Sequence, residues 1–254
     1  MSESKGLVID EVTVLSLLAT VVLLIVAYVA SLRLLPASAS TRSRVLFVWH
    51  SFDALIHFFF EGSFLYNCFF TFINADSVRT FTASTGRQSV AVTASDVHFL
   101  GRADKIYGAN YGTGPTSKLW QEYAKADRRW GEADLGVISL ELLTVLIGGP
   151  LAVWICVLLS RGHGDIRGMI GGKLAFWMIV LATGELYGGF MTFAPEWLTG
   201  SPNLDTSNFM YLWVYLFFFN TLWVWIPLWI LVQSYFSIAS SMPVGTVQEG
   251  KKKA

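Results

Sequence analysis

Residues His50 to Phe64 read HSFDALIHFFFEGSF and carry the most informative polar pattern of the chain. Its polar residues His50, Asp53, His57 and Glu61 recur at spacings of three and four, which places them along one face of a helix. Ionisable groups inside lipid are costly unless they face the interior of a helical bundle. Four polar residues on one face of a helix therefore predict a polar cavity or a polar partner helix.

The rest of the chain has the composition of a membrane protein. Of its 254 residues, 54% are hydrophobic and 14% are charged, whereas a soluble domain carries about 25% charged residues. Apolar runs of roughly 20 residues match the length that a helix needs to cross a hydrocarbon core about 30 Å thick. We therefore expect an all-α integral membrane protein, a bundle of five transmembrane helices at residues 14–32, 45–73, 135–159, 174–194 and 209–236.

Charged residues between these runs predict the orientation, because loops rich in Lys and Arg stay in the cytosol. The first and third connections are basic, whereas the fourth holds only acids. We expect a short non-cytosolic N-terminus (1–13), a membrane domain (14–236) with one long non-cytosolic loop at about 74–134, and a cytosolic tail (237–254). The tail ends Lys251-Lys252-Lys253-Ala254, which resembles a dilysine signal for retrieval to the endoplasmic reticulum membrane. A solvated basic tail is the alternative.

The long loop has two parts that differ in composition. Residues 80–116 are rich in Gly, Ser and Thr and are expected to be irregular, with short strands around 89–93. Beyond Ser117 the sequence continues LWQEYAKADRRW, whose apolar residues recur at helical spacing. This second part predicts an interfacial helix that leads into the third span.

Two classes of function are disfavoured. The net charge is 0 and no basic stripe carries interleaved aromatic residues, so we expect no nucleic-acid partner. Cys68 and Cys156 both lie in apolar runs, which suits buried thiols better than a disulfide framework or a zinc site.

His57 and Glu61 form the central pair of candidate residues. At a spacing of four on a helix they can share a proton, so that one of them serves as an acid or a base. Metal binding is a second use of such a pair, but the other histidines, His98 and His163, lie in loops, so we expect no metal. A structural role, with both side chains bonded to neighbouring helices, is the third interpretation.

The other spans supply further candidates. Glu141 has apolar neighbours in the sequence, a setting that suits proton transfer or cation stabilisation, although a neutral acid with a packing role is the alternative. Asp134 either caps the third span or lines a pocket. Trp223 offers a π face to a cation within about 6 Å. The remaining candidates are Thr144 in the third span, Glu185 and Tyr187 in the fourth and Asn220 in the fifth.

Taken in order, these motifs resemble the emopamil-binding protein family of sterol isomerases, over most of the chain. The resemblance is carried by IHxxxEGxF at 56–64, LWxEYAKxDxR at 119–129, Asp134, Glu141, Thr144, GPLxxW at 149–154, GxxYG at 184–188 and YxWxYxxxxNxLWxxxP at 211–227. Four features depart from the family pattern. They are Glu185 in place of Gln, Gly189 in place of an acid, the extra acid Asp53, and the insertion at 80–116.

The resemblance implies a sterol Δ8-Δ7 isomerase that needs no cofactor. Such an enzyme protonates a ring alkene, forms a carbocation and removes a neighbouring proton. His57 and Glu61 are expected to manage the proton and Glu141 and Trp223 to stabilise the cation. Asn220, with Thr144, is expected to orient the acids. The substrate-binding residues are expected to be Thr144, Asp134, Tyr187 and Glu185.

The expected partners are a sterol substrate and the lipid bilayer, and a homodimer is one candidate assembly. Two other functions stay open at this point. One is a non-catalytic sterol-binding protein of the same superfamily. The other is an acid-catalysed isomerase or cyclase that acts on another terpenoid. The sequence assigns neither the substrate nor the carboxylate that donates the proton.

Overall fold

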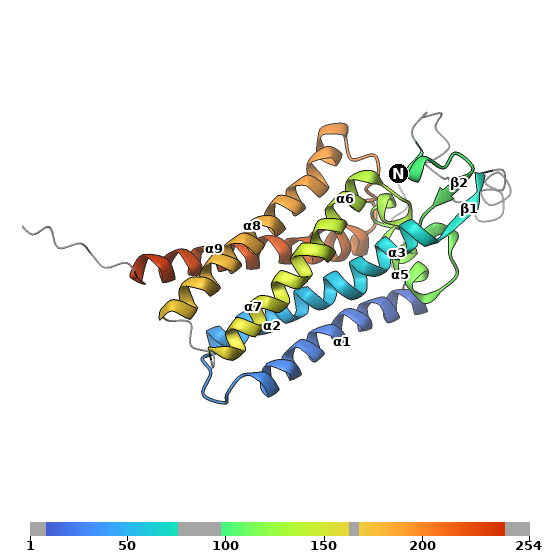
Figure 1. Ribbon diagram of the computed structural model, residues 1–254. Coiled ribbons are helices and arrows are strands. Elements are labelled where there is room, and N and C mark those ends of the chain that lie inside the picture. The colour runs from blue at the N-terminus through green and yellow to red at the C-terminus, as the bar shows by residue number, and fades with distance from the viewer. Residues whose placement is uncertain (1–8, 76–97, 163–167, 242–254) are drawn as a thin grey trace, which may run out of the picture.

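The computed structural model is a bundle of long helices with a small β-ribbon at one end (Figure 1). It describes residues 9–75, 98–162 and 168–241. The α-helices are α1 (Glu11–Leu34), α2 (Thr41–Leu55), α3 (Gly62–Phe70), α5 (Pro115–Tyr123), α6 (Leu135–Leu143), α7 (Gly149–Arg161), α8 (Gly168–Thr199) and α9 (Asn220–Ser241). Three π-helical segments are η1 (Ile56–Glu61), η7 (Thr144–Gly148) and η8 (Met210–Phe219), and three short 3₁₀ turns are η4 (Phe99–Gly101), η5 (Ala109–Tyr111) and η6 (Arg128–Gly131).

Within the described residues, four helices are long and apolar enough to cross a membrane: Glu11–Leu34, Leu135–Arg161, Gly171–Thr199 and Met210–Ser240. Their outer faces are apolar, as α1 illustrates with Leu15, Leu18, Val22 and Ile25, each between 52% and 56% exposed. A continuous apolar face of this kind is an association hazard in water, whereas it is the expected outer surface in lipid. The predicted helical architecture is confirmed, with four candidate membrane spans among the described residues.

The helical run 41–70, built from α2, η1 and α3, lies between α1 and α7 and does not belong to those four helices. Its polar residues lower its hydropathy, and those residues face inward, because His50 and Asp53 are 0% exposed and His57 is 2% exposed. Neighbouring helices surround this polar face, so the run needs less apolar surface than a helix that faces lipid. A transmembrane course for it, and hence the count of five spans, stays a prediction.

The main core lies where α2, α7, α8 and α9 meet. In order along the chain, α1 packs on α2, α2 on α7, α7 on α8, and α8 on α9. Side chains that are at most 1% exposed come from each of the four core helices: Leu46, Phe47, Ile155, Leu159, Leu174 and Ile230. This packing fixes α2 against α7 directly beside the polar face of the run 41–70.

The described part of the long connection, residues 98–134, forms a small folded unit at one end of the bundle (Figure 1). Strands β1 (Phe72–Asn74) and β2 (Lys105–Tyr107) pair antiparallel. Gly108, which follows β2, has φ +137°, and a Cβ at that position would lie 2.6 Å from the carbonyl oxygen of Gly131, so the close approach requires glycine. The predicted interfacial helix is present as α5 but ends at Tyr123. The strands expected around 89–93 lie outside the described residues.

Three segments that the charge pattern assigned to one side of the membrane do meet at one end of the bundle. The Nζ atom of Lys125 lies 3.1 Å from Oδ2 of Asp10, the residue that caps α1. The hydrogen bond from the Thr13 amide lowers the pKa of Asp10 to about 2. Asp127 forms a β-bridge with Leu204 in the connection between α8 and η8. The side that faces the cytosol stays a prediction, and the end of the tail lies outside the described residues.

Arg129 joins the long connection to the end of α8. Its guanidinium donates to Asp127 Oδ2 at 2.7 Å and to the carbonyl of Thr192 at 2.7 Å, and its Nε lies 3.6 Å from Glu196 Oε1. Asp127 and Glu196 are 1% and 4% exposed. Burial alone would lower the pKa of Arg129, but the hydrogen bond and the charge of Asp127 raise it. The cation therefore neutralises two acids that water does not reach.

Replacing Arg129 with Met should destabilise the protein by about 3–5 kcal/mol, because it leaves two buried carboxylates without their cation. Thermal unfolding in detergent measures the loss. R129K should recover only part of it, since lysine lacks the planar fork of donors. The matched control is R102M, which breaks the exposed pair with Asp104 and should leave the midpoint unchanged. Equal midpoints for R129M and R102M would contradict this role.

Candidate active site

The candidate site is built around His57 and Glu61, both on the π-helical segment η1. The Nδ1 atom of His57 lies 2.5 Å from Oε2 of Glu61, and both side chains are largely buried. A π-helical turn is a common device at functional sites because it changes the direction of the side chains around it. The pair that the sequence predicts is therefore in direct contact.

Thr144 connects this pair to Glu141. Its hydroxyl oxygen lies 2.6 Å from Oε2 of Glu61 and 3.1 Å from Oε2 of Glu141. A hydroxyl has one proton to donate, so it can donate to one of these carboxyl groups and must accept a hydrogen bond from the other. When both contacts are made, one of the two acids carries a proton. The arrangement is a line of groups, Glu141, Thr144, Glu61 and His57, along which a proton can move.

The line depends on a close contact between two helices at their π-helical segments. Thr144 is the first residue of η7, which packs against η1. A Cβ at Gly148, the last residue of η7, would lie 3.3 Å from Nε2 of His57. The absence of a side chain there lets the backbone approach the imidazole. Backbone geometry on both helices thus sets the distances within the line.

Asp53 extends the site on the other side of His57. Its Oδ1 lies 3.2 Å from Nε2 of His57 and accepts a hydrogen bond of 2.8 Å from the indole Nε1 of Trp223. Sequence reasoning placed Asp53 on the polar face but did not include it among the site residues. Its spacing of four from His57 is the signal that points to this contact.

Glu185 approaches the same place from α8. One ligand atom each of Asp53, His57 and Glu185 lies within 4.8 Å of the others, and all three residues are buried. The expectation of no metal considered only the other histidines, His98 and His163. Glu185 instead supplies a carboxylate, which completes a set of three potential ligands with Asp53 and His57. The expected absence of a metal is not tested by this geometry.

The predicted residues therefore separate into two groups. The structure gathers His57, Glu61, Glu141, Thr144, Trp223 and Glu185. It places the other three elsewhere. Asp134 caps α6 by accepting from the Val137 amide at 2.9 Å, and Tyr187 is 65% exposed on the apolar outer surface.

Asn220 has a different set of partners from the one expected. Its Nδ2 donates to the hydroxyl of Tyr123 at 3.0 Å and to the carbonyls of Tyr215 and Leu216 at 2.8 and 2.9 Å. Burial raises the pKa of Tyr123, so this hydroxyl stays protonated at neutral pH. Asn220 thus ties the end of η8 to α5, a contact that the sequence did not predict.

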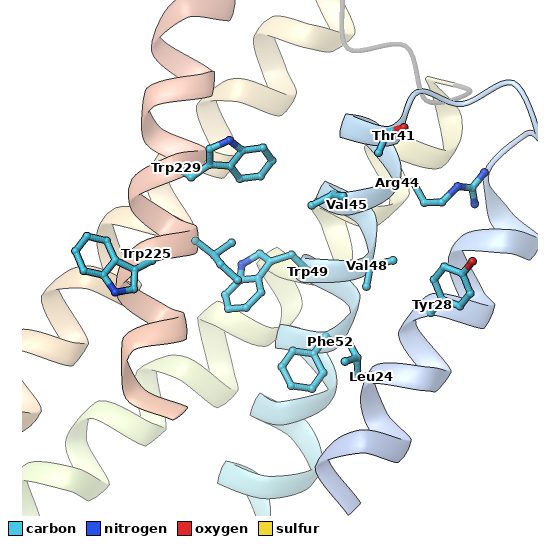
Figure 2. A pocket seen from close by; sticks show the side chains of 11 residues that line it. Leu24, Tyr28, Thr41, Arg44, Val45, Val48, Trp49, Phe52, Trp225 and Trp229 are labelled. Atoms are coloured by element: carbon cyan, nitrogen blue, oxygen red, sulfur yellow. The ribbon is translucent and has the colours of Figure 1, made fainter. Parts of the chain in front are cut away.

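An apolar cavity of about 660 Å³ lies beside the cluster, between α1, α2 and α9 (Figure 2). Trp49, Phe52, Trp225 and Trp229 line it, with Arg44 and Thr41 at one end. The rings of Trp49 and Phe52 are 5.5 and 6.2 Å from the ring of Trp223, the donor to Asp53. A second cavity of about 470 Å³ lies between α1, α2 and α7. The buried acids line neither cavity, and an aromatic layer separates them from the larger one.

Part of the chain matches a known family. Residues 115–234 match the EBP family, described as EXPERA (EXPanded EBP superfamily). The match confirms the resemblance seen in the sequence. Glu141, Thr144, Glu185 and Trp223 lie within the matched residues, whereas His57 lies before them.

Individual relatives give the comparison more detail. The chain is 34% identical over 111 residues to a 3-beta-hydroxysteroid-Delta(8),Delta(7)-isomerase of Cavia porcellus, with 44% of this chain and 45% of the relative covered. A probable isomerase of the same name from Oryza sativa subsp. japonica is 27% identical over 124 residues, covering 49% and 52%. Isomeliandiol synthase of Melia azedarach is 23% identical over 119 residues, covering 47% and 51%. The matches thus span about half the length of these curated relatives.

Replacing Thr144 with Val should destabilise the protein by about 1–3 kcal/mol, because the hydroxyl between Glu61 and Glu141 is lost while the shape of the side chain is kept. Thermal unfolding measures the change. T221V is the matched control, since the Thr221 hydroxyl donates only to the carbonyl of Phe218, at 3.3 Å, among the described residues. A T144V midpoint equal to that of T221V would mean that the bridge contributes nothing.

Proposed function

We propose that this chain is a sterol Δ8-Δ7 isomerase of the endoplasmic reticulum membrane. The observation that carries the proposal is the buried line from Glu141 through Thr144 and Glu61 to His57. Acids and an imidazole in contact, surrounded by apolar helices, suit proton transfer to and from a hydrophobic alkene. The isomerase names of the relatives from Cavia porcellus and Oryza sativa support the same reaction.

The proposed reaction moves a ring double bond from carbons 8 and 9 to carbons 7 and 8. A proton is added at carbon 9, a carbocation forms at carbon 8, and a proton leaves carbon 7, so no cofactor is consumed. His57 and Glu61 manage the proton, and Thr144 orients Glu61 relative to Glu141. Glu141 stabilises the cation as a carboxylate, and Trp223 contributes the face of its ring.

In this proposal Asn220 acts indirectly, through the position of Trp223. It holds the start of α9 through Tyr123, and Trp223 follows three residues later on the same helix. The sterol reaches the acids from the cavity between α1, α2 and α9, where Trp49 and Phe52 form the wall nearest to Trp223. Movement of these aromatic side chains admits the substrate.

The membrane arrangement is part of the proposal. The run 41–70 forms a fifth span, the long connection faces the lumen, and the C-terminal tail faces the cytosol. The meeting of the start of α1, the long connection and the α8–η8 connection at one end supports this scheme.

An acid-catalysed isomerase of another terpenoid is the second candidate function. The similarity to isomeliandiol synthase favours it, and so does the pair of acids Asp53 and Glu185, which the sterol isomerase pattern does not predict. The chemistry of proton addition and removal is common to both candidates. They differ in the ring system that the pocket accepts.

The reaction can be tested by incubating membranes that contain the protein with a Δ8-sterol in deuterated water. The expected product is the Δ7-sterol with deuterium at carbon 9. Binding of the sterol without any product would instead indicate a non-catalytic sterol-binding protein. Conversion of a triterpenoid in place of the sterol would favour the second candidate.

The roles of the acids can be tested with E61Q and E141Q. Each should lower turnover by about 10²- to 10⁴-fold while the protein still folds, because a general acid or base contributes on that order. E196Q is the control and should keep its turnover, because Glu196 is a buried acid that bonds to Asn203 and makes no contact with Glu61, Glu141 or His57. Turnover that is unchanged in both E61Q and E141Q would refute the assignment.

A further inference from the structure

A second pair of acids lies on the far side of His57 from Glu61. Asp53 and Glu185 come from α2 and α8, and their exposed fractions are 0% and 8%. Each places a carboxylate oxygen within 4.8 Å of the other and of a ring nitrogen of His57. Three titratable groups are thus held together at a place from which the surrounding helices exclude water.

Several of these polar atoms make no hydrogen bond. Among the described residues, Oδ2 of Asp53, both carboxylate oxygens of Glu185 and Nε2 of His57 have no hydrogen-bond partner. No described Lys or Arg lies within ion-pair distance of either acid. Two ionised carboxylates at this separation would repel each other in an environment that already disfavours charge. A single proton held between the two carboxylates removes one of the two negative charges and forms a hydrogen bond between one oxygen of each acid.

In the part of the chain that the structure describes, no Lys or Arg forms an ion pair with Asp53 or Glu185 that could replace this proton. The titratable or polar groups that face Asp53 and Glu185 come from each element packed there. They are His50 on α2, His57 and Glu61 on η1, Cys156 on α7 and Trp223 on α9. The histidines are the only groups in this set that can become positive, and each must take up a proton to do so.

We propose that Asp53 and Glu185 share one proton and exchange it with Nε2 of His57. The imidazole then joins two acid pairs, since its Nδ1 contacts Glu61 at 2.5 Å and its Nε2 lies 3.2 Å from Asp53. Asp53 and Glu185 are positioning residues, because they act through His57. Their part in turnover depends on the proposed isomerase function, whereas the shared proton does not.

The exchange balances over one catalytic cycle. When Glu61 has given a proton to the substrate, Nδ1–H of His57 returns a proton to Glu61 while Nε2 accepts one from the Asp53–Glu185 pair. Before carbon 7 is deprotonated, Nε2–H of His57 returns its proton to the Asp53–Glu185 pair while Nδ1 takes the proton of Glu61. The Glu61 carboxylate then accepts the proton from carbon 7, so every group regains its starting protonation state. The two acid pairs on opposite edges of one imidazole thus hold a proton for both transfers, and exchange with solvent between cycles supplies the deuterium that the isomerisation test detects.

Infrared spectroscopy of the full chain in membranes at neutral pH tests the shared proton directly. Wild-type protein should show carbonyl stretches of buried carboxylic acids, shifted in deuterated water, from the Glu61–Glu141 bridge and from the shared proton. The difference spectrum between wild type and E185Q should contain the band of the shared proton, D53N should shift or weaken the same band, and E196Q should leave both contributions intact. A difference spectrum without any carboxylic-acid band for both D53N and E185Q would overturn the proposal. So would a stoichiometric metal ion, measured by mass spectrometry, that E185Q releases.

Turnover provides the second measurement. D53N and E185Q should each lower the rate of isomerisation at least about tenfold, and the double variant should be no slower than the slower single variant, because the pair acts as a unit. Full activity in both single variants would exclude a part in turnover. If wild-type protein converts no sterol, the proposed function fails, yet the infrared comparison still decides whether the proton is shared.

Discussion

One buried imidazole, His57, sets the arrangement of the polar groups inside the helical bundle. His57 has an acid at each ring nitrogen, Glu61 on one side and Asp53 on the other. Ionisable groups at this depth persist only when other polar groups accompany them. Further groups therefore gather behind each acid, Thr144 behind Glu61 and Trp223 behind Asp53. The helices that supply them must pack closely around the run 41–70, which explains why this polar run is the best-shielded helix of the bundle.

Local backbone geometry makes that packing achievable. Both η1 and η7 are π-helical where they touch, and Gly148 leaves space for the imidazole. The same arrangement separates the buried acids from the apolar cavity. The acids lie behind the aromatic layer of Trp49 and Trp223, and the large apolar cavity lies in front of it. A hydrophobic substrate can thus be bound at the lipid side while the acids stay away from water, which suits a reaction with a carbocation intermediate.

The structure also gives a physical explanation for two departures from the family pattern, Asp53 and Glu185. Asp53 and Glu185 are far apart in the sequence, yet they lie together beside His57. Both oxygens of Glu185 and Oδ2 of Asp53 have no hydrogen-bond partner among the described residues, and each acid supplies the other with a partner for a proton. The two acids are therefore one feature of the site, although they are separate departures from the family pattern in the sequence.

The helical architecture and the apolar spans could be predicted from the sequence, because apolar run length and the spacing of His50, Asp53, His57 and Glu61 are local properties. The contact between His57 and Glu61 was also predictable, since these residues lie four positions apart. The choice of which helices meet could not be predicted and is seen in the folded chain alone. The tertiary fold joined Thr144 to both acids, brought Glu185 to Asp53, and left Asn220 bonded to Tyr123. Periodicity assigns a side chain to a face of its own helix, but the neighbour of that face depends on packing between distant segments and on π-helical turns that change the register.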